Sequence, residues 1–346
     1  MPIHEGFGLD LLRVEASPWP RLGCSGALIL LEGRGDFVDC QLLELAPGGQ
    51  CDPQRHLYEE VVYVLEGRGS TTVEGPARKD SFEWGTGSLF ALPPNVSYRH
   101  FNTSGQQRAR LASVTSLPLL LKAFHDHDFV FANDFDFPER FGSERSYRGE
   151  GEFIPVRAGR HQWETNFVPD LRQFELQAWE SRGVGSSNIK FVLADGTMHA
   201  HMSELAVGTY KKAHRHGPDF HIFPVTGRGY SLFWREGDAD HTRIDWRHGW
   251  VYAPPDQVFH QHFNTDAAPS RYVAVAYGSI RYPFTSDKRE LFGGGDRSVN
   301  VGGRQIEYED EDPRIGQTFR QELALNEIRA DPRMEEIWTN RAPRAT

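Results

Sequence analysis

The sequence predicts a protein dominated by β-structure, with two tandem jelly-roll barrels, a short helical linker between them and a C-terminal helix. Two observations predict this fold class. The first is an internal repeat at an offset of about 160 residues. The second is a series of short runs rich in β-branched and aromatic residues, each bounded by Gly or Pro, which is typical of small antiparallel barrels.

The repeat extends over matching segments with a nearly constant spacing. ELAPG at 44–48 reappears as ELAVG at 204–208, QRH at 54–56 as HRH at 214–216, and GRG at 67–69 as GRG at 227–229. Farther on, LPPNVSYRHFNT at 92–103 parallels APPDQVFHQHFNT at 253–265. Such regular spacing indicates a tandem duplication, in which each copy folds as one barrel.

The first half divides into an arm, a barrel and a linker. Residues 1–25 are expected to form an N-terminal arm, and residues 26–117 the first barrel, whose strands include FVDCQLLEL, VVYVLEG and SLFALPP. Residues 118–185 are interpreted as a linker, and its segment PDLRQFELQAWESRG at 169–183 is expected to form a short helix.

The second half repeats the barrel and ends in a helical tail. Residues 186–281 are expected to form the second barrel, with strands in HMSELAV, HIFPVTG, YSLFW, WVYAPP and RYVAVAY. Residues 282–346 are expected to form a tail with a helix around residues 313–338. We expect the linker and the tail to pack around the barrels, at a subunit contact of a homo-oligomer.

Composition excludes several classes of partner. The net charge is −10 and no block of basic residues occurs, so we expect no nucleic-acid partner. No apolar run reaches the length of a membrane span, so we expect no membrane partner. The three cysteines form no CxxC pattern, which favours a reduced, cytoplasmic enzyme over a disulfide-stabilised scaffold.

Candidate metal ligands lie in the second copy. His214 and His216 are two residues apart, so in an extended chain their imidazoles lie on one face. They fall between Gly208 and Gly227, and a third histidine, His260, follows a Gly-strand-Pro segment and precedes Asn264. Imidazole is the commonest metal ligand in proteins, so this set indicates a metal site.

These motifs resemble the two motifs of the cupin superfamily, and the chain resembles a bicupin over residues 26–117 and 186–281. The resemblance implies that His214, His216 and His260 bind a metal. The first copy has Gln54, His56 and Tyr98 at the matching positions, which implies a barrel without metal. That copy keeps Glu60 where the family has a carboxylate ligand, and the second copy has Phe220 there. A weak site of His56, Glu60 and His100 is the alternative for the first barrel.

Three neutral imidazoles leave a divalent metal with its full charge and open positions, so the expected partner is a small anionic, chelating molecule. The HRH form resembles the gentisate and salicylate dioxygenases. The resemblance implies Fe(II), with Mn, Ni or Zn as alternatives, and O₂ as co-substrate for cleavage of a hydroxybenzoate-like compound. That family usually carries its working metal in the first barrel, which weakens the transfer of its reaction to this chain.

Two other functions stay open. One is a non-oxidative metal-dependent isomerase or lyase, in which the metal polarises a carbonyl and a base moves a proton. The other is a bicupin that binds a small ligand without turning it over. An oxygen-dependence assay separates the first of these from a dioxygenase.

Side chains near the histidines are candidates for the substrate pocket. Aromatic residues would stack on the substrate, and Arg and Gln would donate to an anionic group. His262 has a counterpart in the first copy, His100, which favours a structural role, and His221 is interpreted as a packing residue near the site. His199 and His201 are interpreted as ordinary core or surface histidines. The candidates are Phe220, His221, Arg228, Tyr230, Gln257, Phe259, His262 and Arg271.

Overall fold

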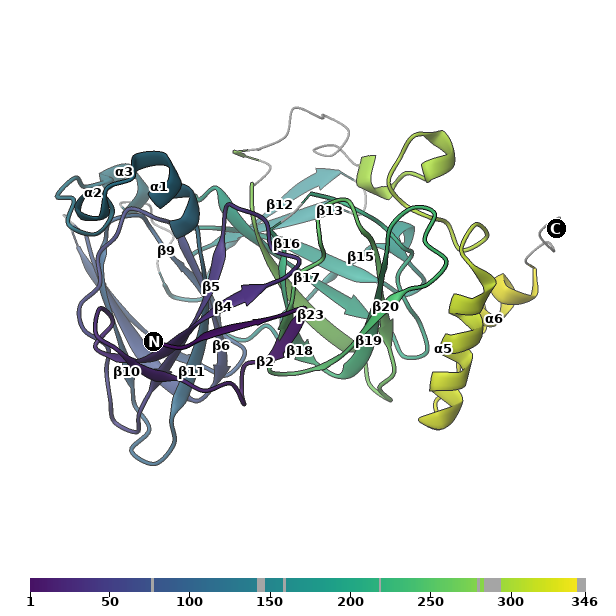
Figure 1. The fold of residues 1–346 in the computed structure, drawn as a ribbon, viewed down its shortest axis with the longest axis horizontal. Coiled ribbons are helices and arrows are strands. Elements are labelled where there is room, and N and C mark those ends of the chain that lie inside the picture. The colour runs from purple at the N-terminus through teal and green to yellow at the C-terminus, as the bar shows by residue number, and fades with distance from the viewer. Residues whose placement is uncertain are drawn as a thin grey trace.

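The computed structural model of the chain places two β-barrels side by side, with the linker helices at one end and the C-terminal helices at the other (Figure 1). The structure describes residues 1–75, 78–141, 147–157, 160–217, 219–278, 281–282 and 294–340. The predicted fold class is confirmed: the described elements are mostly strands, arranged as two jelly rolls with a helical linker and C-terminal helices.

The first barrel consists of a large sheet facing a three-stranded sheet. The large sheet has the order β1-β4-β5-β11-β6-β9-β14, with β3 beside β4, and the small sheet has the order β10-β7-β8. Its strands are β1 (Ile3–Gly6), β3 (Ser17–Trp19), β4 (Cys24–Leu31), β5 (Asp39–Leu45), β6 (Glu60–Glu66), β7 (Arg68–Glu74), β8 (Lys79–Gly85), β9 (Leu89–Leu92), β10 (Ser97–Asn102), β11 (Ala109–Thr115) and β14 (Phe167–Val168).

The second barrel repeats this arrangement. Its large sheet has the order β12-β13-β16-β17-β23-β18-β21-β2, with β15 beside β16, and its small sheet has the order β20-β19-β22. Its strands are β2 (Gly8–Asp10), β12 (Glu152–Arg157), β13 (Arg160–Thr165), β15 (Gln177–Ala178), β16 (Ser187–Leu193), β17 (Met198–Leu205), β18 (His221–Thr226), β19 (Arg228–Trp234), β20 (Thr242–Arg247), β21 (Trp250–Tyr252), β22 (Phe259–Asn264) and β23 (Ser270–Tyr277).

The expected helix at 169–183 is wrong. That segment contains β15 and a single 3-10 turn, η1 (Glu180–Arg182). The carbonyls of Leu171, Arg172 and Phe174 accept hydrogen bonds from the Arg271 guanidinium at 3.0, 3.0 and 2.9 Å, so they are engaged by a distant side chain. The helices of the linker lie earlier, at α1 (Leu117–Phe124), α2 (His127–Phe131) and α3 (Pro138–Phe141).

The two barrels share one hydrophobic core between their large sheets. Phe191, Phe223 and Val273 of the second barrel pack there with Val61 and Tyr63 of the first. Each barrel also has an apolar interior of its own. Side chains alternate along a strand, so every second residue of each large sheet packs between the two barrels. The residues between them line the barrel interiors.

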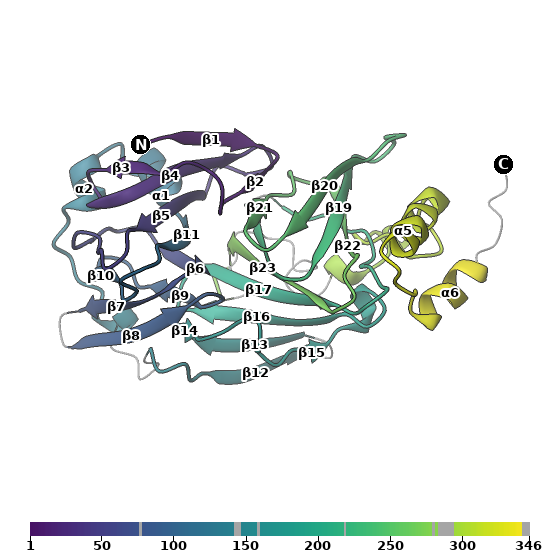
Figure 2. The ribbon, with the colours of Figure 1, turned by 90° about the horizontal axis from the view of Figure 1, so that it is seen from below.

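The N-terminal arm joins both barrels. β1 pairs in parallel with β4, whereas β2 pairs antiparallel with β21 of the second barrel, with Gly8 opposite Tyr252 (Figure 2). In the same way β14, which follows the linker helices, adds to the edge of the first barrel at β9. Both crossings hold the barrels in contact.

The C-terminal tail covers the small sheet of the second barrel. It contains η2 (Gly294–Asp296), η3 (Val299–Val301), α5 (Pro313–Leu325) and α6 (Pro332–Thr339). The single helix expected around residues 313–338 is thus two helices, because Asn326 caps the end of α5 and Asp331 caps the start of α6. Phe319 of α5 and Trp338 of α6 pack against Tyr210, Tyr230 and Phe263 of the barrel. The outer faces of β19 and β22 are therefore largely buried, whereas most residues of β20 are exposed.

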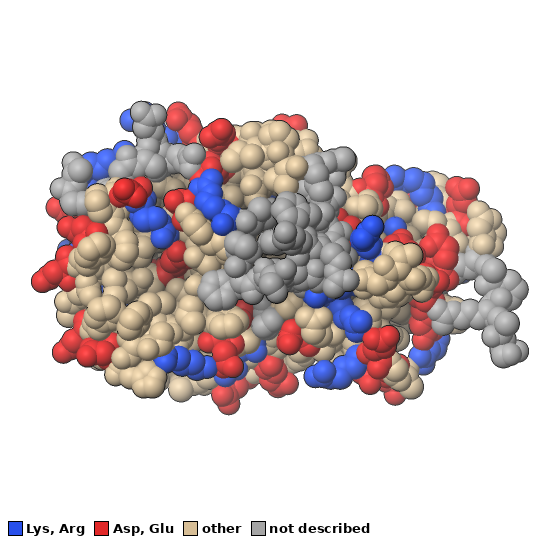
Figure 3. Space-filling view, turned by 90° about the horizontal axis from the view of Figure 1, so that it is seen from above, with Lys and Arg blue, Asp and Glu red and all other residues tan. Residues whose placement is uncertain are grey.

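The surface charge, the helix lengths and the cysteines relate to the partners and the compartment expected from the sequence. Acidic and basic side chains are interspersed on the face shown in Figure 3. Among the described residues, no helix has both the length and the apolar character needed to cross a membrane. All three cysteines are free thiols, and Cys40 and Cys51 are buried.

Candidate metal centre

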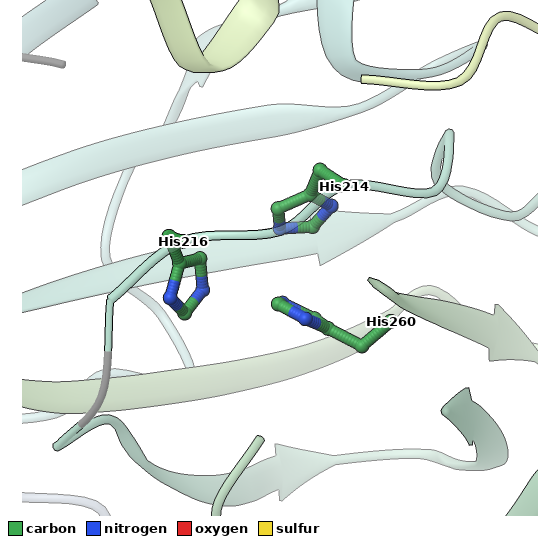
Figure 4. Close-up of side chains that lie close together, drawn as sticks. All are labelled: His214, His216 and His260. Carbon is green, nitrogen blue, oxygen red and sulfur yellow. The ribbon is translucent and has the colours of Figure 1, made fainter. Parts of the chain in front are cut away.

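Three histidines converge inside the second barrel (Figure 4). His214 and His216 lie on the extended segment before β18, and His260 lies on β22. A pair of backbone hydrogen bonds, 3.0 and 2.9 Å long, ties His214 to His260. One nitrogen from each ring lies within 4.8 Å of the others, a spacing from which three imidazoles can bind one ion.

Backbone carbonyls fix the tautomer of each ring. The Nδ1 atoms of His214, His216 and His260 lie 3.2, 2.8 and 3.1 Å from the carbonyl oxygens of Lys212, Gly217 and Val258. A carbonyl only accepts, so each Nδ1 carries the proton and donates it. Each Nε2 therefore keeps its lone pair for a ligand bond, the arrangement that metal-binding histidines require. Within the described residues, Nε2 of His260 is buried without a hydrogen-bond partner.

The surroundings keep these rings neutral. Burial lowers the pKa of His216 to about 4, and burial followed by the charge of Arg182 lowers the pKa of His214 well below its usual value. Burial and the neighbouring His216 do the same to His260. At neutral pH the three rings are therefore unprotonated, and only the neutral form of imidazole binds metal.

Phe220 lies beside the triad, at the position where the first barrel has Glu60. Its ring lies 4.2 Å from the ring of His216, as Glu60 lies against His56 in the first barrel. It also faces His199 and His201 of β17, at 6.0 and 5.7 Å between ring centres. The second barrel therefore presents an aromatic face to the triad where the first barrel presents a carboxylate.

His262 has the same structural partners as its counterpart His100. Trp246 Nε1 donates to Ser231 Oγ at 2.9 Å, and Ser231 Oγ lies 2.8 Å from His262 Nδ1. In the first barrel, Trp84 Nε1 donates to Thr71 Oγ1 at 2.9 Å, and that oxygen lies 2.7 Å from Nδ1 of His100. The same arrangement in a barrel without the triad fits a structural role for His262, whose ring centre lies 5.4 Å from that of His260.

The first barrel closes its equivalent position with hydrogen bonds. His56 Nδ1 donates to the carbonyl of Tyr58 at 3.0 Å, and its Nε2 lies 3.1 Å from Glu60 Oε2 and 3.0 Å from the Tyr98 hydroxyl. Tyr98 also donates to Glu60 at 2.7 Å, and Ser113 donates to the same carboxylate. Burial raises the pKa of Glu60, but the hydrogen bond and charge of His56 outweigh it and hold that pKa at about 2. These contacts use the atoms that a metal would need.

This difference predicts a gain of metal in a double variant. Gln54 and Tyr98 pair through the same bridge as His214 and His260. Replacing both with histidine removes the hydroxyl that occupies His56 and Glu60 and supplies two imidazoles. We expect Gln54→His/Tyr98→His protein to bind about two metal ions per chain where the wild type binds about one. Elemental analysis measures the ratio; the single variant Gln54→His is the control, and a folded double variant with unchanged metal content contradicts the expectation.

Five of the expected pocket residues lie away from the triad. The side chain of Arg228 is exposed and donates to Asn326 after α5 at 2.8 Å. Tyr230 stacks on Phe263 under α5, and Phe259 packs between Trp234 and Arg215. Both face outward, because strand residues alternate and the neighbouring Ser231 and His260 face the interior. Arg271 donates to Glu204 at 2.6 Å. The side chain of Gln257 is exposed beside Asp256.

His221 faces the core between the barrels. It is fully buried on β18, and Phe223 and Val225, which share its face of that strand, pack in this core. Burial lowers its pKa to about 4. The interpretation of His221 as a packing residue is compatible with this position, but its ring does not face the triad. Of the eight candidates, Phe220 and His262 are the two whose rings lie against the triad histidines.

Two cations near the triad were missed by sequence reasoning. Lys211 is 1% exposed and donates from Nζ to the Tyr272 hydroxyl at 2.8 Å. Arg182 is 4% exposed, and its guanidinium donates to Asp296 at 2.9 Å. The charge of Arg182 lowers the pKa of all three triad rings. A comparison of the two copies could have found Lys211, because the first copy has Cys51 at that position.

Comparisons with known proteins agree with this architecture. Residues 41–115 match the family model of the cupin domain. The fold is similar to that of oxalate decarboxylase from Lactobacillus farciminis in a formate complex, with a TM-score of 0.54, 12% identity, and coverage of 86% of this chain and 92% of that chain. The chain has the bicupin fold. Oxalate decarboxylase from Bacillus subtilis matches this bicupin with a TM-score of 0.50 and 12% identity, over 79% of this chain and 76% of that one. No curated protein matches the sequence.

Proposed function

We propose that this bicupin is a metal-dependent enzyme whose second barrel holds one divalent metal on His214, His216 and His260 and acts on a small anionic substrate. The observation that carries the proposal is the common tautomer of the three rings, in which every Nδ1 donates to a backbone carbonyl. Three converging Nε2 lone pairs in a buried site have no structural use without an ion.

A metal in this site would be held by three neutral ligands and would keep its full charge and its open positions. When bound, it supplies a Lewis acid for the oxygen atoms of a substrate. The ligand set suits Fe(II), Mn, Ni and Zn, and Fe(II) stays the prediction from sequence resemblance. Arg182 and Lys211 add positive charge nearby, which supports an anionic substrate.

The reaction class that we favour is non-oxidative. The buried cations around the triad would stabilise the negative charge that develops on a substrate oxygen when a carbon–carbon or carbon–hydrogen bond breaks. The fold shared with oxalate decarboxylases also favours a lyase acting on a small carboxylate. Oxalate itself is therefore the first compound to test.

A dioxygenase is the second candidate. The observation in its favour is the ligand set, in which Phe220 replaces the carboxylate that the first barrel keeps as Glu60. The sequence resemblance to gentisate and salicylate dioxygenases supports the same reading, with O₂ as co-substrate.

A homo-oligomer also stays a prediction; the apolar helix α1, none of whose residues is buried, offers a surface for it.

One experiment separates these functions. Protein purified without a metal-affinity tag is loaded anaerobically with Fe(II), Mn(II), Ni(II) or Zn(II) and given oxalate, other small carboxylates or hydroxybenzoates, with and without O₂. We expect turnover of a carboxylate that requires metal and proceeds without oxygen consumption. Stoichiometric O₂ uptake with ring opening would support the dioxygenase instead. Ligand binding with no turnover under any condition would reject an enzyme in favour of a binding protein.

A further inference from the structure

A buried polar cluster lines the interior of the second barrel beside the triad. It consists of Lys211, Tyr272 and Ser203, with exposures of 1%, 2% and 0%. Lys211 Nζ donates to the Tyr272 hydroxyl at 2.8 Å, and that hydroxyl is also hydrogen-bonded to Ser203. Lys211 Nζ further lies 5.4 Å from the ring centre of Trp179. Nζ also lies 4.9 Å from the ring centre of Tyr272, so the buried ammonium group has a hydrogen-bond partner and two aromatic faces around it.

The cluster is adjacent to the metal centre. The ring of His262 lies between the two, with its centre 4.8 Å from that of Tyr272 and 5.4 Å from that of His260. The backbone N–H of Lys211 donates to the carbonyl of His262 at 3.0 Å, which fixes the start of the lysine side chain relative to β22.

The first barrel shows that the fold does not need this cluster. The ion pairs Arg110–Glu44 and Arg271–Glu204 mark matching positions in the two copies. One residue beyond each arginine, Leu111 pairs with Leu43 just as Tyr272 pairs with Ser203.

The lysine has an apolar counterpart as well. Cys51 stands where the second barrel has Lys211, and it packs with Leu43 and Leu111 in the apolar interior of the first barrel. The polar set and the histidine triad therefore occur together in one barrel, and both are missing from the described residues of the other. A requirement of folding would apply to both copies, whereas a requirement of the substrate applies only to the barrel with the triad.

We propose that Lys211, positioned by Tyr272 and Ser203, binds a carboxylate of the substrate whose other oxygen atoms face the histidine triad. The substrate class is a small molecule with a carboxylate at one end and a metal-binding oxygen group at the other, such as a short dicarboxylate. This inference rests on the proposed function, because it places the second end of the substrate at the metal.

The test measures binding of diacids to zinc-loaded protein by calorimetry, since zinc is redox-inert. The probes are malonate, succinate and glutarate, each compared with its monomethyl ester. We expect wild-type protein to bind one of these diacids and to bind its ester at least about ten-fold more weakly. Lys211→Met should bind the diacid as weakly as the wild type binds the ester, and esterification should then cause no further loss.

Lys79→Met is the control, because Lys79 forms an exposed ion pair with Glu74 in the first barrel, away from the triad. It should keep wild-type affinity, and all proteins should keep their zinc content. If Lys211→Met does not fold, the triple variant Ser203→Leu, Lys211→Cys, Tyr272→Leu reproduces the apolar wall of the first barrel and should bind zinc without binding diacids.

Each remaining outcome decides the proposal. Three results would overturn the proposal: unchanged diacid affinity in Lys211→Met, equal losses of affinity in both lysine variants, or no diacid binding by the wild type. The same titrations on zinc-free protein separate this inference from the proposed function. Diacid binding that depends on Lys211 but not on zinc would keep Lys211 as an anion-binding residue and would reject the role of the metal.

Discussion

Replacing His260 with alanine is expected to remove the metal from the protein. The ring of His260 lies 4.3 and 4.6 Å from the rings of His214 and His216, and two imidazoles alone do not complete a site. Loss of one supporting group outside the ligands already weakens metal binding by about 10- to 100-fold, so loss of a ligand should exceed that. The measurement is metal content after tag-free purification, together with zinc affinity against a competing chelator.

The first barrel supplies the control for this experiment. His56→Ala removes the matching histidine of the other copy, whose Nε2 is already engaged by Glu60 and Tyr98. Its metal content should equal that of the wild type. Full metal occupancy in His260→Ala would refute the three-histidine site, and loss of half the metal in His56→Ala would show that the first barrel binds metal as well.

The largest effect on stability is expected from Glu60→Ala. Glu60 accepts from Tyr98 and Ser113 and lies beside His56, and all of these groups are buried. Removing the carboxylate leaves the buried groups that donate to it without an acceptor, and each such group costs about 1–3 kcal/mol. Denaturant unfolding at pH 7 measures this loss. Glu74→Ala, which breaks an exposed pair with Lys79, should cost at most about 1 kcal/mol.

This stabilisation should depend on pH in one direction. The pKa of Glu60 falls from 4.5 to about 2 on folding, so its ionised form is favoured in the folded state. The contribution is therefore complete above pH 4.5 and is lost as the pH falls toward 2. The difference in unfolding free energy between wild type and Glu60→Ala should be constant near neutrality and shrink in acid. A difference that stays constant down to pH 3 would exclude this role of the carboxylate.

Much of the fold could be predicted because the same sequence pattern occurs in both halves of the chain. The repeated segments around His56 and His216 and the two PP-to-HFN segments predict two similar barrels without any knowledge of their packing. The crossing of β2 to β21 could not be predicted, since Gly8 and Tyr252 form a pair that no local pattern records. The wrong helix at 169–183 has the same cause, because Arg271 engages its carbonyls from another strand.

The candidate site was predictable to the same extent. The motif spacing brought out the three histidines that the structure places together. Phe220 and His262 were predicted next to the triad, but the other pocket candidates were not predictable, because the face on which a strand residue points depends on tertiary packing such as the tail. Tyr230 was expected in the pocket and instead lies under α5. Lys211 belongs to no motif, and two signals point to it: its contact with Tyr272, and the Cys51 that stands at its place in the first copy.

The pairing of β2 with β21 has a consequence for the order of events on the ribosome. β2 leaves the exit tunnel long before its partner at residues 250–252 is synthesised. Nascent domains generally fold in order from the N-terminus, so β1 can join β4 while β2 still lacks its partner. β2 therefore stays without its partner until β21 has been made, and translation that stops before β21 leaves β2 as an unpaired strand edge.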